Sequence, residues 1–153
     1  MAQDREPFLK RWSRRKLEEA PPDVDVLLAG GIVPVALKGL DVVHRFYERF
    51  DQRTMDDIDL LVAPDRAMAA IELLEAAGWT APDDARRRHW LRSMYELPLN
   101  APGPLELWMD LHWGLAQERR YRLSIGPVLE RARPLEINGR RIRRLDDHDA
   151  AAH

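Results

Sequence analysis

Two carboxylates spaced for one face of a strand are the clearest chemical signal in the sequence. Residues 57–62 read D-I-D-L-L-V, so Asp57 and Asp59 stand at the start of an apolar run. In a strand, alternate side chains share a face, which places both carboxylates beside Leu61. Neighbouring carboxylates repel each other unless a cation lies between them, and oxygen ligands favour a hard ion such as Mg²⁺. The spacing therefore predicts a metal site on a largely apolar strand.

The alternative is that these acids only form the polar entry to a strand, because acidic residues cluster at turns. That explanation accounts readily for Asp56. It accounts poorly for Asp59, because the apolar run begins beside it and burying an unpaired carboxylate is unfavourable. We therefore favour a functional pair of Asp57 and Asp59.

A second polar strand face lies in residues 105–113, where apolar and polar side chains alternate. This pattern is typical of a half-buried strand, and its polar face carries Asp110 and His112. A third carboxylate beside the first pair would complete a two-metal site. A solvent-facing strand surface remains the alternative for Asp110. His112 is open to two interpretations, contact with a nucleotide or a structural role with its hydrogen bonds satisfied.

Lys38 and Gly39 stand where a predicted strand turns into a predicted helix. Glycine lets the backbone approach a phosphate, helix N-terminal amides favour anions, and lysine adds a compact positive charge. Arg53 precedes Asp57 by four residues on a predicted loop. Phosphate contact is therefore a functional interpretation of Lys38-Gly39, whereas Arg53 by itself is compatible with ordinary surface charge.

The elements that must position these residues alternate between strand and helix. Glycines bound a buried strand at 32–37, a central strand covers 57–63, and 90–97 and 105–113 add two more. Asn138-Gly139 predicts a hairpin turn within 135–145. Helices are predicted at 1–20, 23–28, 40–50, 64–77, 125–132 and from 146 onward, with a charged loop at 82–88. This order predicts an α+β (α/β two-layer) fold, a sheet flanked by helices.

Composition limits the classes of function. The chain has 153 residues, of which 45% are hydrophobic and 33% charged, as expected for one globular domain. It contains no cysteine, which excludes disulfides, thiolate metal sites and cysteine nucleophiles. The net charge of −2 gives no indication of a nucleic-acid partner. No apolar run is long enough for a signal peptide or a membrane span, so we expect a cytoplasmic protein.

The order of these motifs resembles a poorly characterised nucleotidyltransferase family of the DNA-polymerase-β-like superfamily. The shared motifs are L-K-G at 37–39, an amphipathic helix, R-T-M at 53–55, D-I-D-L-L-V at 57–62 and D-L-H-W at 110–113. The predicted hairpin also resembles the later G-x-x-I-x-x-L segment of the family. Two departures stand out: Lys38-Gly39 replaces the Gly-Ser or Gly-Gly of the wider superfamily, and Thr54 replaces a proline.

The resemblance implies a nucleotidyltransferase-like mixed sheet flanked by helices. It also implies that Asp57, Asp59 and Asp110 hold two Mg²⁺ ions, with Mn²⁺ as a substitute, and act in catalysis. The implied reaction transfers a nucleoside monophosphate from a nucleoside triphosphate, ATP by default, to the hydroxyl of an unknown acceptor. The implied nucleotide contacts are Lys38, Gly39, Arg53 and His112.

The resemblance further implies a catalytic core at 23–153, preceded by a helical extension at 1–22 and ending where the family continues into a further helical region. Two rival functions remain. One is a toxin or abortive-infection type of nucleotidyltransferase, in which a second glycine usually follows Lys-Gly, where this chain has Leu40. The other is a non-catalytic nucleotide-binding or interaction module.

Overall fold

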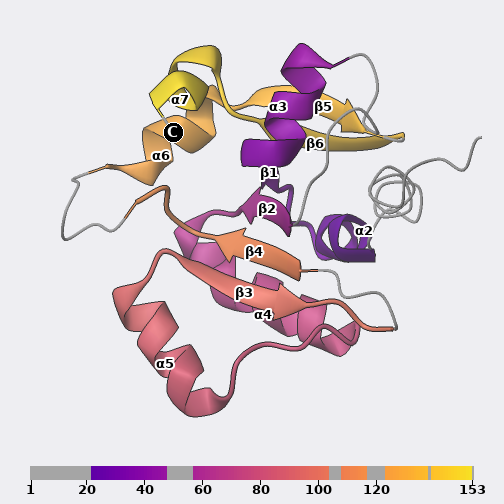
Figure 1. The fold of residues 1–153 in the computed structure, drawn as a ribbon, viewed down its shortest axis with the longest axis vertical. Helices are drawn as coiled ribbons and strands as arrows, with labels where there is room; N and C mark the ends of the chain where they lie inside the picture. The colour runs from indigo at the N-terminus through magenta and orange to yellow at the C-terminus, as the bar shows by residue number, and fades with distance from the viewer. Residues whose placement is uncertain (1–21, 48–56, 104–107, 117–122, 138, 153) are drawn as a thin grey trace, which may run out of the picture.

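A mixed β-sheet forms the centre of the computed structural model, which describes residues 22–47, 57–103, 108–116, 123–137 and 139–152. The strands are β1 (Val35–Ala36), β2 (Asp57–Leu61), β3 (Glu96–Asn100), β4 (Trp108–His112), β5 (Arg133–Ile137) and β6 (Arg140–Arg144). They form one six-stranded sheet in the order β3-β4-β2-β1-β6-β5 (Figure 1). The helices are α2 (Pro22–Ala29), α3 (Lys38–Phe46), the 3₁₀ turn η2 (Pro64–Arg66), α4 (Ala67–Ala76), α5 (Asp84–Ser93), α6 (Ile125–Arg131) and α7 (Asp147–Ala152). The predicted α+β class is confirmed.

The two strands that carry the predicted carboxylates are direct neighbours. β2 pairs in parallel with β4, and Asp59 lies opposite Asp110 in the register. On its other side β2 pairs antiparallel with β1, while β3 pairs antiparallel with β4 at the edge of the sheet. Since residues in register share a face, Asp59 and Asp110 project from the same side of the sheet.

The alternation of β2 divides the interior into two apolar clusters. Ile58, Leu60 and Val62 belong to the larger core, which also contains buried side chains of α2, α3 and α4. Leu61 belongs to a smaller core formed with Val35, Leu37, Val128, Ala132 and Leu145. The predicted division of this strand into two faces is confirmed, and Asp59 shares its face with the smaller core.

Two predictions about residues 82–97 are wrong. The expected loop at 82–88 and strand at 90–97 are instead α5, followed by β3. Asp83 caps α5, because its side chain accepts a hydrogen bond of 2.9 Å from the backbone N–H of Arg86. The arginine run that suggested a surface loop is also compatible with a helix, since arginine has a high helix propensity. Pro98 is accommodated because β3 is an edge strand.

Other elements differ mainly in length. The strand expected at 32–37 is paired only over β1, and α3 begins two residues before the expected start at Leu40. The 135–145 hairpin is confirmed by the pairing of β5 with β6, and Gly139 has a φ of 76° beside the turn. The helical extension predicted at 1–22 lies, apart from Pro22, outside the described residues, as does the loop at 51–55. Among the helices of the described ranges, none has the length and apolar character required to cross a membrane.

Candidate active site

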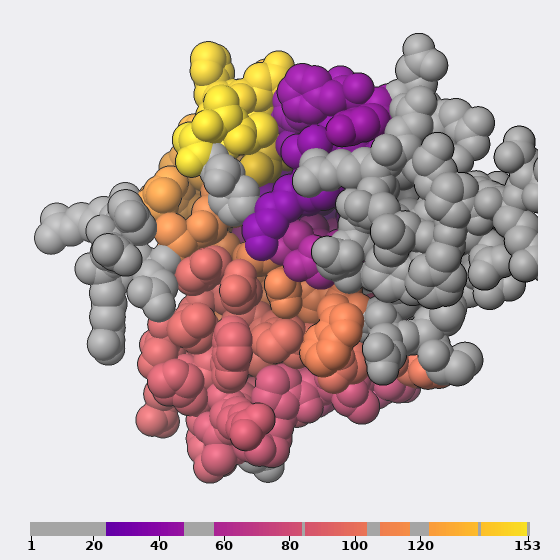
Figure 2. Space-filling model, viewed as in Figure 1, coloured from indigo at the N-terminus to yellow at the C-terminus, as the bar shows by residue number. Residues whose placement is uncertain are grey.

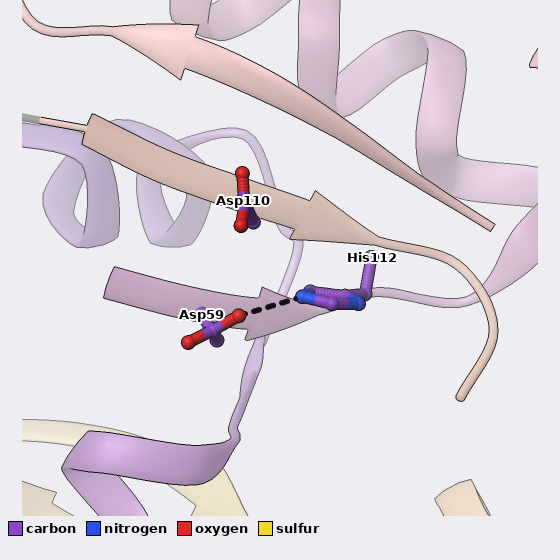
Figure 3. Close-up of side chains that lie close together, drawn as sticks. All are labelled: Asp59, Asp110 and His112. Atoms are coloured by element: carbon purple, nitrogen blue, oxygen red, sulfur yellow. Dashed lines mark hydrogen bonds and ion pairs between the residues drawn. The ribbon is translucent and has the colours of Figure 1, made fainter. Parts of the chain in front are cut away.

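Asp59, near the middle of β2, is the centre of a buried polar cluster. Its side chain is 2% exposed. Its Oδ1 accepts a hydrogen bond of 2.6 Å from Nζ of Lys38 and lies 2.8 Å from Nε2 of His112 (Figure 3). Burial by itself would raise the pKa of Asp59, but the hydrogen bonds and positive charge of His112 and Lys38 hold it below its ordinary value. Asp59 is therefore ionised, and an ionised carboxylate accepts hydrogen bonds without donating them.

The pKa of Asp110, which lies opposite Asp59 on β4, is shifted in the other direction. Burial raises the pKa of Asp110, and the charges of Asp59, Glu96 and Asp57 raise it further, against a smaller opposing effect of His112. Two facing carboxylates thus have pKa values displaced in opposite directions. This pattern is common where catalytic groups need different protonation behaviour.

His112 lies between carboxylates on two strands. Its side chain is fully buried, with Nε2 toward Asp59 and Nδ1 3.2 Å from Oε2 of Glu96 on β3. The Nδ1–Oε2 pair is close enough for ionic attraction but lacks the alignment of a hydrogen bond. The ring of Tyr95 packs 6.1 Å from the His112 ring, tilted by 34°. These contacts fix the orientation of the imidazole.

Lys38 reaches the cluster from the first residue of α3 with an unusual backbone conformation. Its φ is 42°, in the left-handed region that is unfavourable for a residue with a side chain. Burial would lower the pKa of Lys38, but the hydrogen bond and charge of Asp59, together with Glu96 and Asp110, raise it above its ordinary value. A strained residue with its side chain on an active carboxylate is a pattern associated with functional sites.

A second ion-pair network holds the helix that carries Lys38. The guanidinium of Arg45 on α3 donates 2.8 Å to Oδ2 of Asp41 and 2.7 Å to the carbonyl of Leu145, and it also pairs with Asp147 of α7. Because Arg45 is largely buried, this network ties α3 firmly to α7. The network anchors the C-terminal end of α3 to the segment that joins β6 to α7.

The donor set fits a divalent cation. One ligand atom each from Asp59, Asp110 and His112 lies within 4.8 Å of the others. The three side chains project from neighbouring strands to one side of the sheet (Figure 3). The negative charges that help to raise the pKa of Asp110 also repel its carboxylate, and a bound cation would relieve this repulsion.

The structure brings together Asp59, Asp110, His112 and Lys38. Asp57 begins β2 and is partly buried, but it is not one of the three residues whose ligand atoms lie within 4.8 Å of one another. Gly39 is the second residue of α3, directly after Lys38. Arg53 lies outside the described residues.

Sequence reasoning missed Glu96 and Tyr95. Both fall within the strand predicted at 90–97, of which only the last two residues belong to β3. Their importance comes from the antiparallel pairing that places Glu96 opposite His112, which no local pattern specifies. The strand signal could have suggested a search for acids in this segment, but not which one faces the site.

Comparisons with known proteins bear on the family and on the fold. A family model described as "Uncharacterised nucleotidyltransferase" matches residues 22–153. A crystal structure of the lincosamide antibiotic adenylyltransferase LnuA, with lincomycin bound, is similar with a TM-score of 0.54 and 14% sequence identity. The match covers 84% of this chain and 79% of the LnuA chain, and it is a similarity of fold. A search of curated proteins finds no match.

Proposed function

We propose a reaction for this chain from its family, since it belongs to the uncharacterised nucleotidyltransferase family. In this proposal it transfers a nucleoside monophosphate from a nucleoside triphosphate to an acceptor hydroxyl. The observation that supports this proposal most directly is the Asp59–Asp110 register on adjacent strands, with Lys38 bound to Asp59 from the start of the neighbouring helix. ATP is the proposed donor.

Asp57, Asp59 and Asp110 are the proposed ligands of two Mg²⁺ ions, for which Mn²⁺ can substitute. Asp59 and Asp110 already lie face to face, and Asp57 stands two residues earlier on the same strand. Divalent cations held by such carboxylates supply stabilisation of the charge that develops on the phosphoryl oxygens. His112, locked between Asp59 and Glu96, holds Asp59 in the orientation this requires.

Lys38 and Gly39 bind the triphosphate in this proposal. The Lys38 side chain is 44% exposed, so its ammonium can reach a ligand while its base stays fixed at the start of α3. Backbone amides at a helix start favour an anion, and lysine neutralises phosphate charge. Arg53 is the proposed additional phosphate contact, and His112 is a further proposed nucleotide contact.

Asp110 serves as the proton acceptor. The acceptor hydroxyl oxygen forms a bond to the α-phosphorus, the bond from that phosphorus to the pyrophosphate oxygen breaks, and the hydroxyl proton passes to the Asp110 carboxylate. The Asp110 carboxylate is suited to this role in the proposal because it stands on the strand beside Asp59, next to the proposed metal site. Pyrophosphate is the leaving group.

The test is transfer of label from each α-labelled triphosphate to acceptors in a cell extract, with Mg²⁺ or Mn²⁺. The wild type should produce a labelled product, and Asp59→Asn should produce none. Asp65→Asn, an exposed aspartate in η2, is the matched control and should label like the wild type. Nucleotide binding without transfer under every condition would refute the enzymatic proposal and favour a non-catalytic binding module.

A further inference from the structure

A pocket of about 510 Å³ opens beside the carboxylate cluster. Lys38 and Tyr95 line it on the side of the cluster, and Val128 of α6 and Ala152 of α7 line it elsewhere. Figure 2 shows the surface of α7, in yellow, beside that of α3, in purple. Its volume is in the range of pockets that enclose a small organic ligand.

The pocket and the candidate active site share two residues. Nζ of Lys38 is bonded to Asp59, and the Tyr95 ring packs against His112. A ligand in the pocket therefore contacts the same side chains that border the carboxylates. Such a ligand is a participant in the reaction rather than an occupant of a distant site.

The lining is mainly apolar, and its charges are already compensated. Leu115, Leu123 and Val128 provide apolar walls. The carboxylate of Asp149 is held by two bonds from Arg131, at 2.7 and 3.1 Å, and Lys38 is paired with Asp59. Beyond Lys38, which the proposed function assigns to the triphosphate, the described lining residues include no basic side chain. A ligand with several negative charges would therefore find few partners here, whereas an uncharged apolar one removes apolar surface from water.

The nucleobase has a different surface available on the same sheet face. Trp108, at the start of β4, is 49% exposed and lies opposite Asp57 in the register. A broad aromatic ring at this end of the carboxylate row can stack on a base of any identity. The polar edges of a base, by contrast, would be poorly satisfied among the leucine, valine and alanine side chains of the pocket.

We propose that the pocket binds the acceptor, and that the acceptor is a small, uncharged, largely apolar molecule carrying a hydroxyl group. The proposal rests on the nucleotidyl transfer proposed above and specifies its second substrate. It distinguishes this class of acceptor from nucleic acids and proteins.

Two neighbouring alanines of α7 provide a matched pair of variants. Ala152 lines the pocket, whereas Ala151 is exposed and is not part of the lining. Ala152→Trp should fill the pocket, and Ala151→Trp adds the same side chain outside it. Leu123→Asp introduces a charge into the apolar wall at a side chain that is 48% exposed, so the fold should tolerate it. Circular dichroism confirms folding of all three.

Three measurements test the proposal. Nile red, a neutral apolar fluorophore, should bind the wild type and Ala151→Trp, and it should bind Ala152→Trp and Leu123→Asp about tenfold more weakly or less. With the cell extract as the source of acceptor, the α-labelled triphosphate should give an acid-soluble labelled product distinct from the free mononucleotide, and the two pocket variants should lose this product. Titration with mant-ATP and Mg²⁺ should give the same affinity for all four proteins.

Each contrary result has a separate meaning. Weakened mant-ATP binding in the pocket variants would overturn the proposal by assigning the pocket to the nucleotide. Label that precipitates with protein or nucleic acid would overturn the acceptor class while leaving nucleotidyl transfer intact. Equal Nile red binding by all four proteins would overturn the pocket assignment itself. Failure of the wild type to bind or transfer any triphosphate would instead refute the proposed function.

Discussion

The two faces of the sheet differ in the charged side chains that they carry. On the face of Ile58 and Leu60, the larger core joins buried side chains of all six strands to α2, α3 and α4. On the opposite face, Asp59, Asp110 and His112 occupy positions beside a much smaller apolar cluster. The same strands therefore supply stability on one side and reactive groups on the other.

This difference shows how a modest domain tolerates a strained and charged site. Burial of apolar side chains on one face contributes the favourable free energy of folding. That contribution allows the other face to retain a carboxylate with a raised pKa and a lysine in the left-handed region. Substitutions on the two faces should consequently have opposite profiles, one affecting stability and the other activity.

The largest expected effect is that of Asp59→Asn. Asn retains the shape but removes the charge that binds Lys38 and the proposed cations, so transfer should fall by on the order of 10³-fold or more, with metal-dependent nucleotide binding also lost. Single-turnover rates and Mg²⁺-dependent mant-ATP titration measure both quantities. We expect Asp57→Asn to behave in the same way. Wild-type rates in either variant would remove that residue from the site.

Asp110→Asn should separate turnover from binding. Transfer should fall by roughly 10²–10⁴-fold through loss of the proton acceptor, while mant-ATP affinity stays near that of the wild type. The same substitution removes repulsion from Asp59 and Glu96, so the melting temperature without metal should rise. A lower melting temperature would contradict the electrostatic explanation.

Leu74→Ala is the counterpart on the opposite face. Leu74 is fully buried in the larger core, so its truncation should lower the free energy of unfolding by about 2–5 kcal/mol. The transfer rate per folded molecule should be unchanged at low temperature, as judged by urea denaturation beside rate measurements. Met68→Ala on the same helix is the control, because Met68 is exposed. A large rate loss in folded Leu74→Ala would show that the two faces are coupled.

Lys38 allows charge and backbone strain to be distinguished. Lys38→Ala and Lys38→Gly both remove the ammonium, so both should weaken triphosphate binding by about 10–100-fold. Only glycine adopts a φ of 42° without penalty, so the Gly variant should be more stable than the Ala variant by about 1 kcal/mol. Isothermal calorimetry and thermal melts check the two effects. Unchanged triphosphate affinity would make Lys38 an ordinary structural ion pair.

The smallest effect concerns acid pH. In the folded protein the pKa of Asp110 is raised above 3.8, so its ionised form destabilises the fold at neutral pH. This destabilisation disappears as the pH falls through the raised pKa toward 3.8, because the carboxyl group then becomes protonated. The melting-temperature advantage of Asp110→Asn should therefore shrink between pH 7 and pH 4. Asp59 has a lowered pKa, so its stabilising contribution is present above 3.8 and is lost only as the pH falls through its lower folded value. A constant advantage across this range would contradict the assignment to Asp110.

Features that depend on a local pattern could be predicted from the amino-acid sequence alone. Strand parity in residues 57–62 assigned Asp59 to the face of Leu61, because side-chain alternation is a property of any strand. Asn138-Gly139 located the hairpin through turn geometry. The wrong prediction at 82–97 also rested on a local pattern: the arginine run suggested a loop, but Asp83 caps a helix at this place.

The pairing of these strands in the sheet, by contrast, could be known from the tertiary structure alone. The parallel pairing that places Asp110 opposite Asp59, and the antiparallel pairing that brings Glu96 to His112, join segments far apart in the chain. The strained φ of Lys38 and the pocket between α3, α6 and α7 likewise result from packing. Long-range pairing depends on the simultaneous burial of many side chains, and for that reason no single segment of the sequence encodes the site.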